Sequence, residues 1–391
     1  MWLSDFTLVL PDRVVPHGSL RIEGGRIAEI AERPVPGGVD GAGCTVFAGF
    51  IDMHGDMIEH ELEPRVRVDF PVDVALGHLD ARLAAAGVTT AYASLSFTKG
   101  AKDGERRSLE HTGRTIRALH AAKDRLRIDH RIHARFDITL DDAVGVLKGL
   151  LDDGMVDLVS VMDHTPGQGQ YRNLEIFIQN QAAYHEVSLD EARAIVQQKI
   201  LDRQRPQEVI LHNLREVSAL CRSHGVALAS HDDDTVEKGH LMADMGAVIS
   251  EFPVTLEAAE TVAARGLMTA MGAPNAMRGK SYSGNLSARD AHAAGLLHIL
   301  AADYHPAAIL PAIRALAETD PNGLAGAACL ANANPARALG LTDRGALAPG
   351  LSADLAIVDP TDRVIATLCG GAIVYSNGLL EGLAQAARAA A

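Results

Sequence analysis

Imidazole and carboxylate side chains follow a series of short apolar segments, each at the point where a segment ends. Six residues stand in such positions: His54, Asp56, Asp137, His164, His231 and Asp303. Imidazoles and carboxylates without thiolates suit Zn²⁺, Mn²⁺ or Fe²⁺ as ligands. We therefore predict a centre for divalent metal, with these six residues as its ligands and two ions of one of these metals.

Hydrolysis is the chemistry expected of such a centre. Two neighbouring divalent ions lower the pKa of a water molecule between them and polarise the bond that is to be cleaved. Asp303 would then take the proton of that water and pass it to the leaving group. It is the predicted catalytic residue.

The same residues also have structural interpretations. An Asp at a strand end is often the N-cap of the next helix, and we expect such a cap among Asp232, Asp233 and Asp234. For Asp137, a salt bridge with Arg135 competes closely with the ligand role. The metal centre is favoured because ligand-type residues end several separate strands, which independent placement would rarely produce.

The elements that would position these residues alternate through the middle of the chain. Eight β-like apolar runs are separated mostly by amphipathic helical stretches: Phe50–Met53, Val88–Ala93, Arg131–Asp137, Asp157–Asp163, Val226–Ser230, Ala247–Phe252, Leu267–Gly272 and Leu297–Ala302. This alternation predicts an α/β fold, a TIM-like (β/α)₈ barrel whose site lies at the carboxyl ends of the strands. An open doubly wound sheet is the alternative, but no Gly-rich dinucleotide turn is present.

Short β-like segments with turn signals occupy both ends of the chain. They predict a small β-sandwich domain assembled from residues 1–47 and 345–379, with the barrel over residues 48–344. The stretch near residues 165–206 is too long for an ordinary loop of a barrel. We expect a helical insertion there that forms a lid or an oligomer contact, so a homo-oligomer is compatible with the sequence.

Composition excludes several functional classes. The net charge of −14 comes without a basic stripe, so no nucleic-acid partner is expected. No apolar run reaches the roughly 18 to 20 residues that span a membrane, and no secretory signal opens the chain. Four well-separated cysteines form no CxxC pair. Together these features predict a cytoplasmic protein with reduced thiols.

Several motifs carry a resemblance to the amidohydrolase superfamily. They are the split β-domain, the stretch Ala48–Asp56, the later histidines, the Asp303 strand, Asn334–Arg337 and Gly345–Leu355. The superfamily commonly has His-x-His on its first strand, where this chain has His54-Gly55-Asp56. The resemblance also implies a bridging ligand, and since no carboxylated lysine is evident, Asp137 takes that role.

Five further segments resemble one branch of that superfamily, the phosphonate-metabolism family of the carbon–phosphorus lyase pathway. These segments are Ser160–Tyr171, Ala229–Thr235, Glu251–Pro253, Met271–Ser281 and Ala302–Pro306. The resemblance implies hydrolysis of α-D-ribose 1-methylphosphonate 5-triphosphate to the 5-phosphate and pyrophosphate. The rival predictions are an enzyme that cleaves a C–N bond, such as a cyclic amidase or deaminase, and a non-catalytic assembly protein.

Glycine-rich loops with polar and cationic residues make a phosphorylated small-molecule substrate plausible. Glycines allow close backbone approach, and amides of such loops bind phosphate oxygens. Cationic side chains add strong hydrogen bonds to phosphate. The predicted substrate-binding residues are Arg65, Gly167, Gln168, Asn275, Arg278, Lys280 and Ser281.

Overall fold

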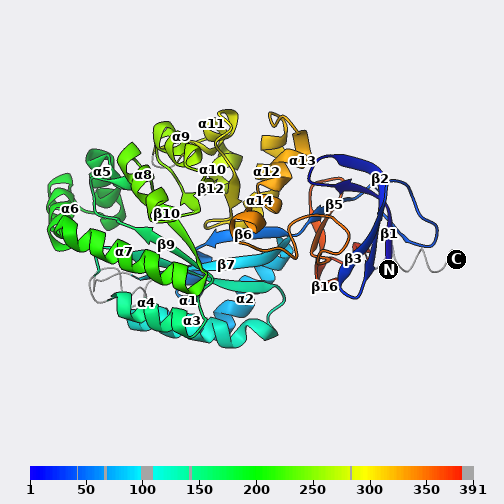
Figure 1. Cartoon of the computed structure of the whole chain (residues 1–391), viewed down its shortest axis with the longest axis horizontal. Helices are drawn as coiled ribbons and strands as arrows, with labels where there is room; N and C mark the ends of the chain where they lie inside the picture. Colours follow the sequence, from blue (N-terminus) through cyan, green and yellow to red (C-terminus); the bar gives the residue numbers. More distant parts are fainter. Residues whose placement is uncertain (42, 66–67, 98–108, 141–142, 282–283, 381–391) are drawn as a thin grey trace.

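Eight parallel strands form a barrel at the centre of the molecule (Figure 1). The structure is a computed structural model that describes residues 1–41, 43–65, 68–97, 109–140, 143–281 and 284–380. Each barrel strand pairs in parallel with its neighbours in the chain. The strands are β6 (Phe50–Gly55), β7 (Val88–Phe97), β8 (Asp129–Asp137), β9 (Leu158–Met162), β10 (Ala227–His231), β11 (Ile249–Glu251), β12 (Met268–Gly272) and β13 (Ile299–Ala301). All eight predicted strands are confirmed.

The first and last strands close the barrel through a few backbone contacts. Gly55 forms an isolated parallel bridge with Asp303, and the amide of Asp303 donates to the carbonyl of His54 at 2.9 Å. The buried carboxylate of Asp52 reinforces this seam, because its Oδ1 accepts from the amide of Ala302 at 2.8 Å. The predicted (β/α)₈ fold is therefore confirmed.

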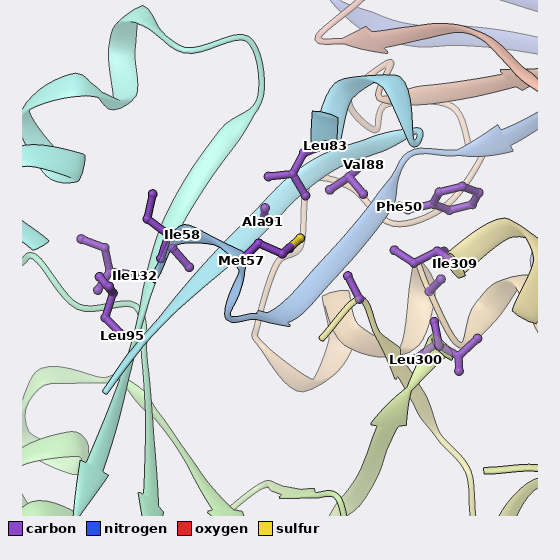
Figure 2. Packing of buried hydrophobic residues seen from close by; sticks show 14 of the residues in the cluster. Phe50, Met57, Ile58, Leu83, Val88, Ala91, Leu95, Ile132, Leu300 and Ile309 are labelled. Atoms are coloured by element: carbon purple, nitrogen blue, oxygen red, sulfur yellow. The ribbon is translucent and has the colours of Figure 1, made fainter. Parts of the chain in front are cut away.

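Helices cover the outer face of the barrel, and the main hydrophobic core lies between them and the strands. In Figure 2, Leu83 lies next to Val88, and Ile309 lies below Phe50. The helices are α1 (Met57–Leu62), α2 (Val72–Ala85), α3 (Leu109–Ala122), α4 (Ala143–Asp152), α5 (Leu174–His185), α6 (Leu189–Arg203), α7 (Gln207–His224), α8 (Val236–Asp244), α9 (Leu256–Ala264), α10 (Ala273–Arg278), α11 (Ala288–Ala293), α12 (Ile309–Ala317), α13 (Gly323–Cys329) and α14 (Ala333–Ala338).

A second, smaller apolar cluster fills the inside of the barrel. Its buried members come from seven of the strands: Met53, Tyr92, Leu158, Ala229, Ile249, Ala270, Ile299 and Ala301. Alternate residues of a strand point to the same side, so the residues two positions after Ala229 and Ile249 also face the interior. Those residues are His231 and Glu251.

The strands near both chain ends join into one mixed sheet at one end of the molecule (Figure 1). Strands β5 and β14 pair antiparallel, which connects the N-terminal and C-terminal segments, and the sheet has a hydrophobic core of its own. Its strands are β1 (Trp2–Val9), β2 (Val14–Glu23), β3 (Arg26–Ala31), β4 (Val39–Asp40), β5 (Thr45–Ala48), β14 (Leu355–Val358), β15 (Val364–Cys369) and β16 (Ala372–Ser376).

Helices α5 and α6 form a hairpin at the opposite end of the molecule (Figure 1). Helix α6 begins with a capping box, in which Ser188 and Glu191 each bond the other's backbone amide. Phe177 and Val196 belong to a small core between the two helices. The insertion is tied to the barrel rim by Arg203, whose Nη1 lies 2.8 Å from Oδ2 of Asp137.

Gly49 lies where the terminal sheet meets the barrel, and its amide donates to the carbonyl of Asp354 at 2.8 Å. A Cβ at this position would come within 2.8 Å of the Cβ of buried Thr89. We predict that Gly49→Ala lowers the free energy of unfolding by about 1–3 kcal/mol through overpacking, measured by urea denaturation.

Gly145 provides the matched control. It lies inside helix α4 with no atom within 4 Å of an added Cβ. Gly145→Ala should raise stability by up to about 1 kcal/mol, because alanine favours helix. If both substitutions change the free energy of unfolding equally, the close contact of position 49 with Thr89 is contradicted.

Candidate metal centre

Three buried ligand-type side chains meet at the carboxyl ends of three barrel strands. His231 ends β10, Glu251 ends β11, and His54 lies near the end of β6. A register irregularity between Asp52 and Gly55 interrupts the pairing of β6 with β7 beside His54. Such irregularities redirect side chains next to active sites, and here they coincide with an imidazole that faces the interior.

The donor atoms of these three residues converge. Nδ1 of His54 lies 3.2 Å from Oε2 of Glu251, and Nδ1 of His231 lies 3.5 Å from the same oxygen. None of the three atoms has a partner in hydrogen-bonding geometry. Two ligands that bind one tetrahedral ion at about 2.0–2.1 Å are separated by about 3.4 Å. The spacing of this trio therefore fits a shared metal ion.

A second group adjoins the first and consists of His164, His231 and Asp232. Nε2 of His164 lies 3.6 Å from Oδ2 of Asp232, an oxygen that has no hydrogen-bond partner. The ring centroids of His164 and His231 are 5.5 Å apart. Since His231 belongs to this group and also faces Glu251, the two groups are neighbours.

His133 lies beside the first group, with Nε2 at 3.5 Å from Oε1 of Glu251. Both of its ring nitrogens are already within hydrogen-bonding distance of hydroxyls, Nδ1 of Ser94 at 2.9 Å and Nε2 of Ser160 at 2.8 Å. This imidazole is satisfied by the barrel interior, so its geometry favours a supporting role beneath the centre.

The residues present fit a divalent metal. Ligand-type atoms that are buried without a hydrogen-bond partner include Oδ1 of Asp56, Nδ1 of His54, Nδ1 of His231, Oδ2 of Asp232 and both carboxylate oxygens of Glu251. Buried polar atoms without partners are costly. One or two cations among them would satisfy several at once, and no protein donor in the described ranges does so.

Burial shifts the protonation of these groups. It raises the pKa of Glu251 to about 7, and it lowers the pKa of His54 to about 3 with help from the positive charge of Arg135. A neutral imidazole is the form that binds a metal ion. Burial also lowers the pKa of His231, so His54 and His231 are neutral and available as ligands at neutral pH.

Asp303 lies at the closure of the barrel, next to Asp56. The amide of Asp56 donates to the carbonyl of Asp303 at 3.0 Å. Burial and the nearby charge of Asp56 raise the pKa of Asp303 to about 7. A carboxylate with this environment can accept and return a proton near neutral pH.

Three residues at the centre hold a left-handed backbone conformation. The φ angles are 53° at Asp232 and 53° at Phe252, which directly follow β10 and β11, and 57° at Asp303, the residue that forms the bridge to Gly55. This conformation is strained for a bulky side chain and is concentrated at functional sites. The ring of Phe252 packs edge-on against His54 and His231, with centroid distances of 4.9 and 5.4 Å.

The structure brings together His54, His164 and His231 of the predicted ligands, and it places Asp56 and Asp303 side by side at the same rim. It does not bring Asp137 into either group. Both oxygens of Asp137 are engaged, Oδ1 by the amide and hydroxyl of Thr139 and Oδ2 by Arg203. This geometry favours a structural role, and the partner is Arg203 instead of the expected Arg135.

Glu251, Asp232 and His133 were not among the predicted ligands. The predicted strand Ala247–Phe252 ran one residue past Glu251, which ends the strand in the structure. A carboxylate this close to a predicted strand end was the signal that could have identified it. Asp232 follows His231 directly and was interpreted as part of a helix cap. That interpretation is wrong, because the N-cap of α8 is Thr235, whose side chain accepts from the amide of Lys238.

The two loops predicted to bind substrate touch each other at the rim. Nδ2 of Asn285 donates to the carbonyl of Gln170 at 3.4 Å, and the side chain of Gln170, not Gln168, lies 3.5 Å from Nε2 of His164. Gly167 has a φ of 104°, as its loop turn requires.

The remaining predicted substrate contacts differ in their surroundings. Oδ1 of Asn275 accepts from the amide of Ala288. Ser281 is half-buried. Arg65, Arg278 and Lys280 are exposed, and none forms an ion pair within the described residues. Positive charge is therefore available at this end of the barrel.

Solved structures of similar fold are hydrolases. The chain matches N-acetyl-D-glucosamine-6-phosphate deacetylase from Mycobacterium smegmatis with a TM-score of 0.63 and 17% identity, over 96% of this chain and 100% of that one. It matches β-aspartyl dipeptidase from Fervidobacterium islandicum AW-1 with a TM-score of 0.62 and 15% identity, over 97% of each chain. These likenesses show that the chain shares the fold of these hydrolases.

Comparison with curated protein sequences identifies the family of the chain. No family model matches the chain, but it is 35% identical over 374 residues to the α-D-ribose 1-methylphosphonate 5-triphosphate diphosphatase of Escherichia coli (strain K12). The match covers 93% of this chain and 97% of that protein. The chain therefore belongs to the family of this diphosphatase. No helix in the described ranges is long and apolar enough to cross a membrane.

We predict opposite effects on metal binding for substitutions of Glu251 and Asp137. Glu251→Gln should reduce metal affinity by at least about 10- to 100-fold, since a ligand contributes no less than the groups that orient it. Asp137→Asn should keep the metal and instead loosen the α5–α6 hairpin by breaking its contact with Arg203. Elemental analysis after dialysis measures the first effect and limited proteolysis the second.

Arg203→Met is the matched control, because it breaks the same contact from the other side. It should reproduce the proteolysis of Asp137→Asn with full metal content. Loss of metal in Asp137→Asn and retention in Glu251→Gln would reverse the two assignments.

Proposed function

We propose that this chain hydrolyses α-D-ribose 1-methylphosphonate 5-triphosphate to the 5-phosphate and pyrophosphate. The observation that carries the proposal is the 35% identity, over nearly the whole of both chains, to the diphosphatase of Escherichia coli. The convergence of His54, His231 and Glu251 supports the proposal independently, because a metal ion bound there would activate water for hydrolysis.

We assign His54, His231 and Glu251 to one metal ion because both imidazoles lie close to Oε2 of Glu251, and His164 and Asp232 to a second ion, with His231 between the two groups. Asp56 completes the acidic rim through its unpartnered Oδ1. Ions bound there would lower the pKa of a coordinated water and offset the charge of the polyphosphate. Zn²⁺, Mn²⁺ and Fe²⁺ all suit this set of nitrogen and oxygen donors.

Asp303 is the residue assigned to proton transfer. Its raised pKa allows its carboxylate to take a proton from the attacking water as the new O–P bond forms. The bond between that phosphorus and the departing pyrophosphate oxygen breaks, and Asp303 can return the proton to the product. Its position at the β6–β13 seam holds it against Asp56, opposite the ligands on β10 and β11.

Exposed cations at the rim suit the charge of the substrate. Arg278 ends helix α10 and Lys280 follows it, on a segment that starts at Gly272 next to Asp303. Neither side chain is paired with a carboxylate within the described residues. We assign them to the polyphosphate, a role that a neutral C–N substrate would not need.

A reducing compartment such as the cytoplasm is consistent with the thiols. Cys44 and Cys221 are buried and unpaired, and Cys329 and Cys369 are also free. Disulfides are rare where glutathione and thioredoxin keep thiols reduced.

Replacement of Asp303 by Asn should lower the rate of pyrophosphate release by about 10²- to 10⁴-fold, because the amide cannot accept the proton. Metal content should stay unchanged. The rate is followed by coupled detection of pyrophosphate, with ammonia release from cyclic amides and nucleobases assayed in parallel.

Asp153→Asn provides the same chemical change on the exposed end of α4 and should be fully active. Near-normal turnover in Asp303→Asn would remove its proton-transfer role. A wild-type enzyme that releases ammonia but no pyrophosphate would replace the proposed reaction by C–N cleavage.

Replacement of Lys280 by Ala should raise KM for the triphosphate by about 10-fold or more, since a hydrogen bond from a charged donor is lost. Hydrolysis of a neutral ester should be unaffected. Lys148→Ala, which removes a lysine paired with Asp152 on α4, is the control. An equal rise in KM for the ester and the triphosphate would exclude Lys280 from polyphosphate binding.

A further inference from the structure

Arg135 is a buried cation in the middle of the metal centre. It lies on β8, its side chain is on the interior face with those of His133 and Asp137, and only 7% of the residue is exposed. One hydrogen bond holds it: Nη2 lies 2.9 Å from Nε2 of His231. Its Nε has no partner, and no carboxylate oxygen of the described residues comes within the 4.0 Å of an ion pair.

A buried arginine without an ion pair is unusual. Guanidinium has five N–H donors and no acceptor, and buried charges are normally paired. The neighbouring Arg131 on the same strand follows that rule, because its Nε lies 3.1 Å from Oδ2 of Asp129. Arg135 therefore has a buried donor, Nε, without a partner, and its charge has no carboxylate of the described residues at ion-pair distance.

The one bond that Arg135 makes is incompatible with a metal ion on His231. Arginine only donates, so Nε2 of His231 must supply a lone pair to it. A neutral imidazole has one nitrogen with a free lone pair. If the metal takes Nε2, that lone pair is used; if the metal takes Nδ1, the proton moves to Nε2, which then faces Arg135 as a donor. In both cases the bond to Arg135 is lost.

We propose that Arg135 exchanges His231 for a phosphoryl oxygen of the substrate when the centre is loaded with metal. Arg135 is then a substrate-contact residue inside the barrel, and Arg278 and Lys280 hold the polyphosphate from the rim. The substrate assignment rests on the proposed function, while the exchange of partners rests on Arg135 and His231 alone.

The exchange places the guanidinium where charge develops. As the water oxygen bonds to phosphorus and the bond to pyrophosphate breaks, negative charge gathers on the non-bridging oxygens of the reacting group. The planar fork of arginine matches two such oxygens. Asp303 handles the proton, so Arg135 contributes charge and orientation only.

The proposal makes two measurable predictions for Arg135→Met in the full chain. Affinity for metal should rise by roughly 10-fold, because arginine no longer competes for His231. Affinity of the metal-loaded protein for inorganic phosphate should fall by roughly 10- to 100-fold, because a charged donor is missing. Competition with a chelating dye measures the first quantity, and calorimetry with excess metal the second.

Arg131→Met, which removes a paired arginine from the same strand, should change neither quantity. Arg135→Lys keeps the charge without the fork, and its phosphate affinity should lie between those of wild type and Arg135→Met. Circular dichroism confirms that each variant is folded. If Arg135→Met is unfolded, Arg135→Lys provides the test. Wild-type affinity of Arg135→Lys for both metal and phosphate would overturn the proposal.

A folded Arg135→Met with unchanged phosphate affinity overturns it as well. The proposed function fails separately, if the wild-type holoenzyme releases no pyrophosphate from the triphosphate. If phosphate affinity still depends on Arg135 in that case, the exchange of partners by Arg135 remains supported. Only the assignment of the triphosphate as the substrate is then wrong.

Discussion

Buried charge without protein partners is the constraint on which the site depends. The side chain of Glu251 has no exposed surface, neither of its carboxylate oxygens has a partner in hydrogen-bonding geometry, and an imidazole nitrogen of His54 and one of His231 lie near Oε2. Burial of an ionised carboxylate is costly unless it is paired or coordinates a metal. Serine hydroxyls satisfy His133 just below, so the barrel can supply partners where it needs them. Six of the buried atoms without a hydrogen-bond partner gather among His54, Asp56, His231, Asp232 and Glu251, which favours a ligand site over a defect in packing.

The barrel provides this arrangement through two simple rules of strand geometry. Alternation along β10 and β11 places His231 and Glu251 on the same face as the buried apolar residues Ala229 and Ile249, one step further along each strand. Closure between β6 and β13 then adds His54 and Asp303 from the other side. Left-handed backbone at the ends of β10, β11 and β13 marks where the chain is strained to aim these groups.

Sequence periodicity was sufficient for the barrel, because each strand is a short apolar run whose end can be read locally. It also located His54, His164 and His231, which follow such runs. It could not distinguish Glu251 from Asp137, since both end a strand. What separates them is a partner 66 residues away, Arg203 on an inserted helix, and that contact has no local signal. Asp232 was missed for a related reason, because a carboxylate before a helix looks like a cap until Thr235 is seen to occupy that position.

Three polar residues of strand β8 lie on the interior face of the barrel at successive heights, and each has a different role. His133, Arg135 and Asp137 share the interior face: the imidazole is satisfied by hydroxyls at the bottom, the guanidinium lies unpaired at the level of the ligands, and the carboxylate holds the insertion at the rim. A slip of one residue in register would send all three to the outer face and bring Ala134 and Phe136 inside. The anchor of the insertion and the cation of the centre are therefore fixed by the same pairing with β7 and β9, so neither can shift without the other.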